Sequence, residues 1–343
     1  MRFATYNVEW FAVLFDDHDE MIFDHSWSGR NDVTKQQQLE ALGQVFRSVD
    51  ADAFMIIEAP NTGRKQNTIH ALENFAKHFE LRQTAAVMGF VNPTHQEIAL
   101  LYDPTKMTAR HMPRGAETGP EGGTKNVRFD GAFLLDLDID AEPDPIVFSK
   151  PPLEVLLEIK DGPALHLIGV HAKSKVPHGA KTPADEIRIA IENRKKQLAQ
   201  CIWIRQRVDE HLDEGNALIV LGDFNDGPGL DTYEQLFGQS GVEIVLGHRQ
   251  SPARQLYDPN AAVALSPRNF VMPTTARFYK HDTKTYLNAL LDYVMVSPDL
   301  GAKGSWQIWH PFDNPTCFND DDLCQALLTA SDHFPVSIDL KLG

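Results

Sequence analysis

The stretch ALIVLGDFNDGPG, residues 217–229, runs from an apolar segment directly into a carboxylate and an amide, Asp223 and Asn225. The apolar run predicts a buried strand, and alternation along a strand places Asp223 and Asn225 on one face with Phe224 on the other. Carboxylate and amide oxygens are the ligands that a hard cation such as Mg²⁺ prefers. A lone pair of this kind is also typical of an ordinary turn, because Asp and Asn hydrogen-bond their own backbone.

The same pattern recurs where other apolar runs meet an Asp, Glu, Asn or His. One polar strand end is unremarkable, but several in one chain predict a shared site, although a lone histidine is more often structural than catalytic. These residues are Asn7 and Glu9 in TYNVEWF, Glu58 in FMIIEAPN, His171 in LIGVHAKSK, Asp292 in LLDYVMVS, and Asp332 and His333 in TASDHFPVSI.

A layered α/β framework must position these strand ends. Apolar runs bounded by turn residues predict more strands than one small sheet holds, and segments with helical periodicity lie between some of them. This mixture predicts two β-sheets packed face to face with helices outside, an α/β sandwich in one domain spanning 1–343. The predicted strands are 2–8, 53–57, 84–88, 97–102, 132–139, 153–160, 164–171, 217–222, 290–296 and 334–341, and the predicted helices are 34–48, 67–79, 184–212 and 230–237.

Three polar or glycine-rich stretches, 14–33, 112–128 and 301–330, are expected to be loop insertions. Long loops between strong elements are often lids or binding loops, and plain surface loops are the alternative. The third stretch holds aromatic residues that would either stack on a ligand or form a subsidiary core. They are Trp306, Trp309, Phe312 and Phe318.

Composition limits the classes of partner. The chain has 48 acidic and 32 basic side chains and a net charge of −16, whereas proteins that grip nucleic acid by themselves usually show a basic face. A phosphate-bearing substrate would therefore need a local basic rim, a bound cation, or both. We find neither a secretion leader nor an apolar stretch of membrane-spanning length, and the chain's three cysteines suit a reducing compartment. These features favour a cytoplasmic protein, and nothing in the sequence indicates a protein partner.

Taken in order, these motifs resemble the endonuclease/exonuclease/phosphatase family, which includes DNase I-like nucleases and several phosphatases. The resemblance covers nearly the whole chain and implies a four-layer α/β sandwich with the active site at one edge of the two sheets. Besides the strand ends above, it is carried by QEIALLYDP with Glu97 and by FSKPPLEVLLEI with Lys150.

The resemblance implies a metal-dependent phosphoesterase. Phosphoester hydrolysis requires charge stabilisation on the phosphoryl and leaving oxygens, which a divalent cation supplies. Glu58 would be the main ligand of Mg²⁺, with Asn7, Glu9 and Asp332 binding directly or through water; Mn²⁺ or Ca²⁺ are alternatives. Asp223 and Asn225 would position the attacking water.

The resemblance also pairs each histidine with a carboxylate, His333 with Asp292 and His171 with Glu97. A neighbouring carboxylate orients the imidazole and raises its pKa, which favours a proton donor near neutral pH. His333 would transfer a proton or stabilise phosphate oxygens, and His171 would stabilise charge or protonate the leaving group.

Lys150, Lys173 and Lys175 are candidate phosphate contacts. Bacterial DNA-degrading members of the family usually carry an arginine where Lys150 stands, and a lysine offers a point charge in place of a bidentate fork. The main hypothesis is a nuclease that cleaves DNA or RNA phosphodiesters. The alternatives are a phosphatase or phosphodiesterase for a small or lipid phosphoester, and a catalytically silent binding protein.

Overall fold

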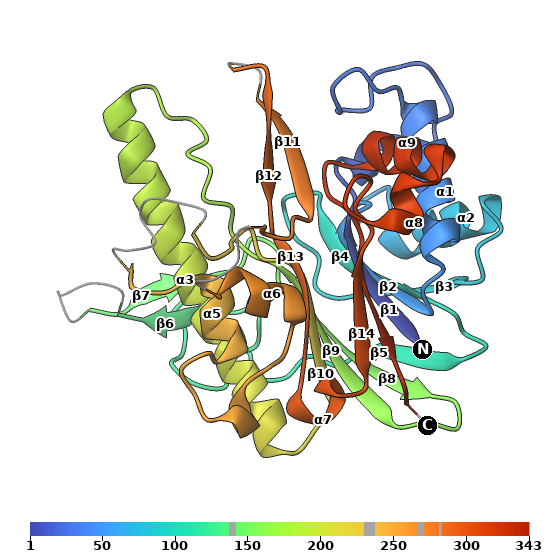
Figure 1. Ribbon diagram of the computed structural model, residues 1–343. Helices are drawn as coiled ribbons and strands as arrows, with labels where there is room; N and C mark the ends of the chain where they lie inside the picture. The colour runs from blue at the N-terminus through green and yellow to red at the C-terminus, as the bar shows by residue number, and fades with distance from the viewer. Residues whose placement is uncertain (137–141, 230–236, 267–270, 281–282, 343) are drawn as a thin grey trace.

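The computed structural model describes residues 1–136, 142–229, 237–266, 271–280 and 283–342 (Figure 1). Two mixed β-sheets form its centre. The first sheet has six strands in the order β14 (Gly304–Ile308), β15 (Val336–Leu340), β1 (Arg2–Asn7), β2 (Ala53–Ala59), β4 (Glu97–Tyr102) and β3 (Ala85–Met88). The second has five in the order β13 (Asp292–Val296), β10 (Leu218–Asp223), β9 (Ala164–His171), β8 (Leu153–Ile159) and β5 (Met107–His111).

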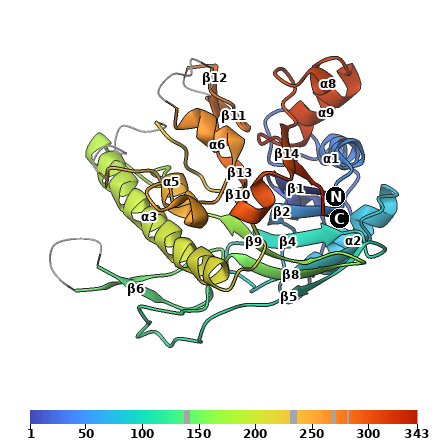
Figure 2. The same ribbon diagram turned by 60° about the horizontal axis from the view of Figure 1, so that its bottom comes forward.

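Helices cover the outer face of each sheet (Figures 1 and 2). The first sheet is covered by α1 (Lys35–Val49), α2 (Thr68–His78) and α9 (Asp321–Ala330), and the second by α3 (Pro183–Asp213), α5 (Gly241–Leu246) and α6 (Pro259–Ala264). The four-layer α/β sandwich is therefore confirmed. Within the described ranges, none of the helices combines the length and apolar content needed to cross a membrane.

Side-chain alternation along the central strands builds three apolar layers. On β2, Phe54 and Ile56 pack beneath α1 and α2, while Met55 and Ile57 point into the layer between the sheets. Strand β10 divides its side chains in the same way between the other helical layer and the space between the sheets. Strands buried on both faces read as continuous apolar runs, which is why the sequence predicts them well.

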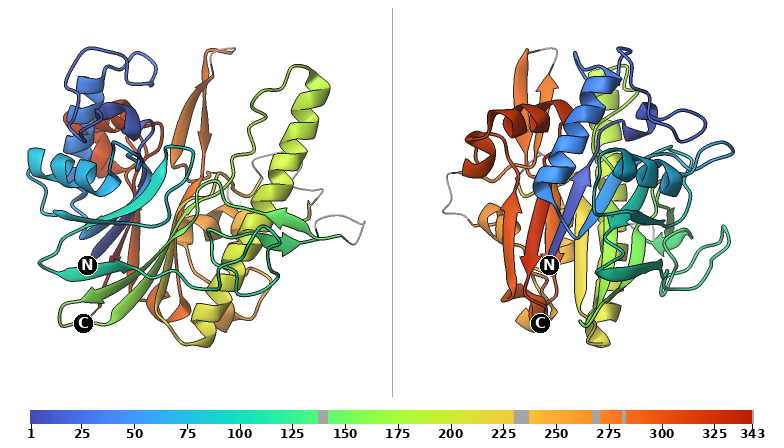
Figure 3. Two further views of the ribbon diagram at one scale, coloured as in Figure 1. Left: turned by 180° about the vertical axis from the view of Figure 1, so that it is seen from behind. Right: turned by 90° about the vertical axis from the view of Figure 1, so that its right-hand side faces the viewer.

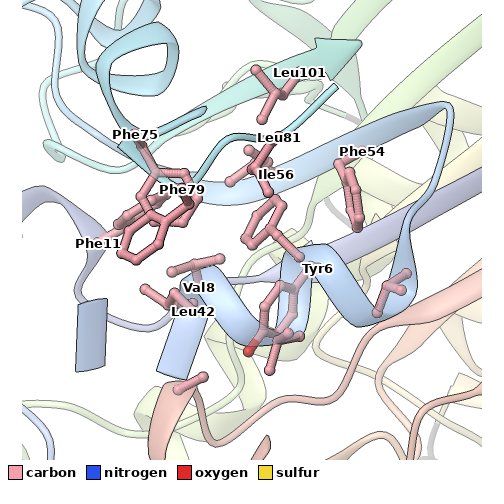
Figure 4. Packing of buried hydrophobic residues seen from close by; sticks show 14 of the residues in the cluster. Tyr6, Val8, Phe11, Leu42, Phe54, Ile56, Phe75, Phe79, Leu81 and Leu101 are labelled. Atoms are coloured by element: carbon pink, nitrogen blue, oxygen red, sulfur yellow. The ribbon is translucent and has the colours of Figure 1, made fainter. Parts of the chain in front are cut away.

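The core beneath α1 and α2 is rich in aromatic rings (Figure 4). Phe75 of α2 makes an edge-to-face contact with Phe11, with ring centroids 5.3 Å apart, and Phe46 of α1 lies 4.6 Å from Phe54 of β2. Such pairs add about 0.5–1.5 kcal/mol each beyond the burial of their area. This packing fixes the first sheet against its helices and so the positions of its strand ends.

The remaining elements are short. Strands β6 (Phe133–Leu135) and β7 (Asp144–Ile146) form one small sheet, and β11 (Ala276–Lys280) pairs with β12 (Thr285–Ala289) in a hairpin. This hairpin stands out from the body between the two helical layers, away from both termini (Figures 1 and 3). The short helices are η1 (Phe11–Leu14), η2 (Pro252–Arg254), α7 (Pro298–Gly301) and α8 (Pro315–Phe318).

One predicted insertion is wrong. Residues 301–330 are not a loop, because they contain β14, which pairs with β15 in the first sheet, and α9, which packs on α1. Trp309 is buried in the core, whereas Phe312 and Phe318 are exposed. Most of the predicted helix 230–237 and the second half of the predicted strand 132–139 lie outside the described residues.

Candidate active site

The polar strand ends meet at one cavity of about 750 Å³ at the edge of both sheets. Within the second sheet, pairing brings three of them onto neighbouring positions, because Asp223 lies opposite both His171 on β9 and Asp292 on β13. The first sheet contributes the ends of β1 and β2 and the residues that precede β15. The predicted site residues that line the cavity are Asn7, Glu9, Glu58, Lys150, His171, Asp223, Asn225, Asp332 and His333.

Asp223 is held by hydrogen bonds on both carboxylate oxygens. Asn7 Nδ2 donates to Oδ2 at 2.9 Å, and the backbone and side-chain amides of Asn225 donate at 2.7 and 3.2 Å. Burial raises the pKa of Asp223 to about 7, with His333 and these donors opposing the shift. A carboxyl of that pKa can exchange a proton near neutral pH.

Gly222 allows β10 to deliver Asp223 to this position. Its φ is +139°, in a region that residues with a side chain rarely adopt, and a Cβ atom there would collide with the carbonyl oxygen of Val170 on β9. Asn225 also has a positive φ, +49°, which Asn tolerates better than most residues. The turn after β10 therefore depends on residue types that accept unusual backbone angles.

His333 and Asp292 form the expected pair. His333 Nδ1 lies 2.7 Å from Asp292 Oδ2, which also accepts a hydrogen bond from the Thr275 hydroxyl at 2.8 Å. Burial alone would lower the pKa of His333, but Asp292, Asp223 and Asp332 raise it well above its usual value. His333 is therefore a charged donor whose Nε2 faces Asp223 at 4.0 Å.

The pairing of His171 with Glu97 is wrong. Within the described chain, His171 Nδ1 is buried without a hydrogen-bond partner, and its Nε2 lies 3.3 Å from Lys150 Nζ. Burial, together with Lys150 and His333, moves the pKa of His171 well below its usual value, opposite to the prediction. His171 is thus neutral and 3.7 Å from Asp223 Oδ2.

Glu97 instead binds Asn92, whose side-chain amide donates to its Oε2 at 2.6 Å. Burial raises the pKa of Glu97 to about 7. Its neighbour Gln96 lines the cavity and donates to Glu58 Oε2 at 2.7 Å. Sequence reasoning missed Gln96 because the two residues are adjacent, and only the local backbone decides which one enters the site.

A β-bulge directs Glu58 into the cavity. The register of β2 against β4 shifts between Ile57 and Ala59, and Glu58 takes a φ of +61°. Regular alternation would have placed its side chain under the helices with Ile56, so the bulge redirects it. Burial raises the pKa of Glu58, with Lys150 opposing the shift.

Several carboxyl groups lie close together in the cavity. Burial raises the pKa of Asp332 to about 8, and Glu9 and Glu58 add to this rise. Glu9 is ion-paired with Arg30 and accepts a hydrogen bond from Trp10 Nε1 at 3.1 Å. A cation placed among these carboxylates would relieve both their repulsion and their desolvation.

The donor set fits a hard metal ion. Asn7 Oδ1 is buried and has no hydrogen-bond partner within the described ranges, and amide and carboxylate oxygens are suitable ligands for Mg²⁺. A second group, Asp223, Asp292 and His333, presents ligand atoms within 4.8 Å of one another, close enough to hold a metal. In that group, however, the atoms of His333 and Asp292 already bind each other.

The lysines divide into two groups. Lys150 is within reach of the cavity, and burial lowers its pKa against the pull of Glu58 and Asp223. Lys175 also lines the cavity, where its Nζ lies 2.6 Å from Asp226 Oδ1. Lys173 does not line it, which leaves its predicted phosphate contact without support from the geometry.

The β11–β12 hairpin supplies part of the wall that sequence reasoning missed. Phe278 packs edge-to-face on His333 with ring centroids 5.5 Å apart, and Leu287, Ala289 and Leu291 continue the same apolar surface. The alternation in ARFYK and TYLNA was a usable strand signal. The sequence could not show that this hairpin packs on the imidazole of His333.

Comparison with known proteins agrees with this architecture. TDP2 from Caenorhabditis elegans is 15% identical over 98% of this chain and 73% of its own, with a TM-score of 0.50. A 3′ phosphatase, NExo from Neisseria bound to product DNA hairpin, is 14% identical over 99% of both chains with a TM-score of 0.49. A mannosyl-6-phosphatase from Bacteroides thetaiotaomicron is 16% identical over 100% of both, with a TM-score of 0.48. No curated protein matched the chain in sequence.

At 15% identity, the likeness to TDP2 shows the fold alone. The sequence profile of the Endonuclease/Exonuclease/phosphatase family matches residues 4–333 and so spans the cavity residues from Asn7 to His333. The enzymes of this family are metal-dependent phosphoesterases. The chain therefore belongs to the Endonuclease/Exonuclease/phosphatase family, and the chemistry of its site is phosphoester hydrolysis.

Proposed function

We propose that this protein is a Mg²⁺-dependent nuclease that hydrolyses phosphodiester bonds in DNA or RNA. The observation that carries the proposal is the convergence on one cavity of Glu58 from β2, Asp223 from β10 and His333 from the segment before β15. These three residues differ in charge state and hydrogen bonding, which suits three different tasks in one reaction.

Glu58, Asp332 and Asn7 Oδ1 would hold the ion, with Glu9 joining through water because it is already paired with Arg30. When bound, the ion supplies positive charge to the phosphoryl oxygens and the leaving oxygen. The raised pKa values of Glu58 and Asp332 support this assignment, because burial raises both and a bound cation would favour the ionised forms.

Asp223 takes the role of general base. The donors from Asn7 and Asn225 fix its orientation, and its pKa of about 7 allows it to accept a proton from the attacking water. His333 stays protonated beside it through Asp292 and presents its Nε2–H to the phosphate, where it stabilises developing negative charge.

Lys150 and His171 serve the opposite side of the phosphate. Lys150 donates to His171 Nε2, which places the ammonium group at the edge of the cavity next to Asp223 and Glu58. A substrate oxygen arriving there could accept from Lys150 in place of the imidazole. His171, which is neutral and accepts from Lys150 through Nε2, would orient that ammonium group towards the leaving oxygen and not supply a proton itself.

A phosphatase or phosphodiesterase for a compact phosphoester is the second candidate. One observation favours it: the cavity has an apolar wall made by Phe278, Leu287 and Leu291, and such a wall can enclose the leaving group of a small or lipid ester. The net charge of −16 also disfavours long polyanions unless a cation and local basic residues compensate.

The proposal is tested by measuring hydrolysis with and without Mg²⁺. The substrates are plasmid DNA, a short RNA and DNA oligonucleotide, and bis-p-nitrophenyl phosphate. Cleavage of the polymers only with Mg²⁺ supports the nuclease, and turnover of the small ester alone supports the second candidate.

His333→Ala should lower kcat by at least about a hundredfold, the scale of a lost proton-transfer group. The matched control is His248→Ala, because His248 is exposed and lies outside the cavity. Glu58→Gln should raise the Mg²⁺ concentration needed for half-maximal activity.

A further inference from the structure

The β11–β12 hairpin has two chemically different faces. Phe278 pairs with Leu287 and Ala276 with Ala289, and the side chains of these apolar pairs share one face of the ribbon. That face lines the catalytic cavity. Arg277 and the opposed pair Tyr279 and Tyr286 occupy the other face.

The second face lines a separate pocket of about 360 Å³. This pocket adjoins the catalytic cavity, since Glu9, Phe278 and Asp332 line both. Its far wall comes from Phe312, before α8, and from Asn31 in the loop that precedes α1. The hairpin thus separates the reacting centre from a neighbouring pocket, and it stands between the two helical layers in Figure 1.

Arg277 is held in this pocket by aromatic rings. The guanidinium carbon lies 3.9 Å from the ring centroid of Tyr286 and 4.8 Å from that of Phe312. Its Nε is buried without a hydrogen-bond partner in the described part of the chain, and no acidic side chain there lies within 4.0 Å of the guanidinium. Arg30, in the same pocket, is by contrast paired with Glu9.

Flat stacking between rings leaves the donor edge of a guanidinium available. Such a planar fork matches the geometry of a phosphate better than a lysine does, and stacking reduces the entropy lost on binding. A buried donor without a partner also costs free energy that an incoming acceptor would recover. Arg277 borders the catalytic cavity, because its backbone N–H donates to the carbonyl oxygen of Asp332 at 2.7 Å and Asp332 lines both pockets.

We infer that the Arg277 pocket is an anion subsite that binds the phosphate adjacent to the scissile one in a nucleic-acid strand. The inference rests on the proposed nuclease function and deepens it, because it requires a substrate with at least two phosphates. The ring of Tyr286, which is 54% exposed, would lie beside the nucleotide that carries this phosphate.

The test is a binding measurement that needs no turnover. A thymidine dinucleotide with a non-cleavable methylene phosphonate linkage is titrated in MgCl₂ by calorimetry, alone and with an added 5′ or 3′ terminal phosphate. In the unmodified protein, one of the two added phosphates should strengthen binding at least about tenfold, the scale of a charge-assisted hydrogen bond. Arg277→Gln should abolish this gain, and Arg277→Lys should keep part of it.

Lys280→Ala is the control, because it removes an exposed cation from the same hairpin without touching the pocket. It should leave the gain intact. The subsite is disproved if neither terminal phosphate strengthens binding, if Arg277→Gln retains the gain, or if Lys280→Ala abolishes it equally. Failure of the proposed function would look different: the protein would hydrolyse no phosphodiester, whatever the outcome of these titrations.

Discussion

Acidification should weaken the binding of the activating cation. Burial raises the pKa of Asp332, a proposed ligand of the ion, to about 8. This carboxyl therefore carries a proton at pH 6, and a cation that needs its ionised form must displace that proton. Because the pKa of this carboxyl is raised, the affinity for the cation falls as the pH falls.

The size of the effect follows from this pKa. Between pH 8 and pH 6, displacing one proton from a group with a pKa of about 8 weakens the apparent affinity for Mg²⁺ ~50-fold. We therefore expect the apparent affinity for Mg²⁺ to fall at least about tenfold between pH 8 and pH 6.

The assay is the Mg²⁺ concentration for half-maximal hydrolysis of bis-p-nitrophenyl phosphate at pH 6, 7 and 8. Calorimetric titration with Mg²⁺ at pH 7, in two buffers of different ionisation enthalpy, should show about one proton released per ion. Asp332→Asn, which cannot take up the proton, should flatten the pH dependence. The reasoning is refuted if the half-activation concentration changes less than about threefold from pH 8 to pH 6 and no protons are released.

Three further outcomes are expected. Gly222→Ala should cost about 1–3 kcal/mol in urea unfolding and lower kcat/KM, because the new Cβ meets the Val170 carbonyl; unchanged values would contradict the strain argument. Asp292→Asn should lower the pKa of His333, so the alkaline loss of activity should move to lower pH, and a fixed alkaline limb would remove Asp292 from this role. Burial lowers the pKa of His211 to about 3, so between pH 7 and pH 5 the unfolded chain binds a proton there that the folded protein does not. The free energy of unfolding of the unmodified protein should therefore fall by about 2 kcal/mol more over this range than that of His211→Asn. Parallel pH curves for the two proteins would refute this.

Local sequence patterns were enough to predict the strands and many of the residues that meet at the cavity. Asp223 follows a fully apolar strand, and its alternation with Phe224 is visible in the sequence itself, so Phe224 is buried while Asp223 faces the cavity. Glu58 and His333 were predictable because each interrupts an apolar run with a group that no core would accept unpaired. The same reasoning yields the layer architecture.

Long-range packing determined the rest. Asn92 donates a hydrogen bond to Glu97, and Lys150 contacts Nε2 of His171, whose Nδ1 has no hydrogen-bond partner in the described chain. Neither contact leaves a mark on periodicity, because each depends on how loops cross the sheet edge. Segment 301–330 misled for a related reason: its short helices and edge strand are held by their neighbours more than by their own propensity.

Strand pairing in the first sheet joins residues far apart in the sequence. Strand β1, with Asn7, pairs with β15, and the residues Asp332 and His333 lie just before that final strand. Asp332 and His333 therefore reach the cavity only when β15 has joined β1, so a fragment that ends soon after Asp223 would lack both of these groups.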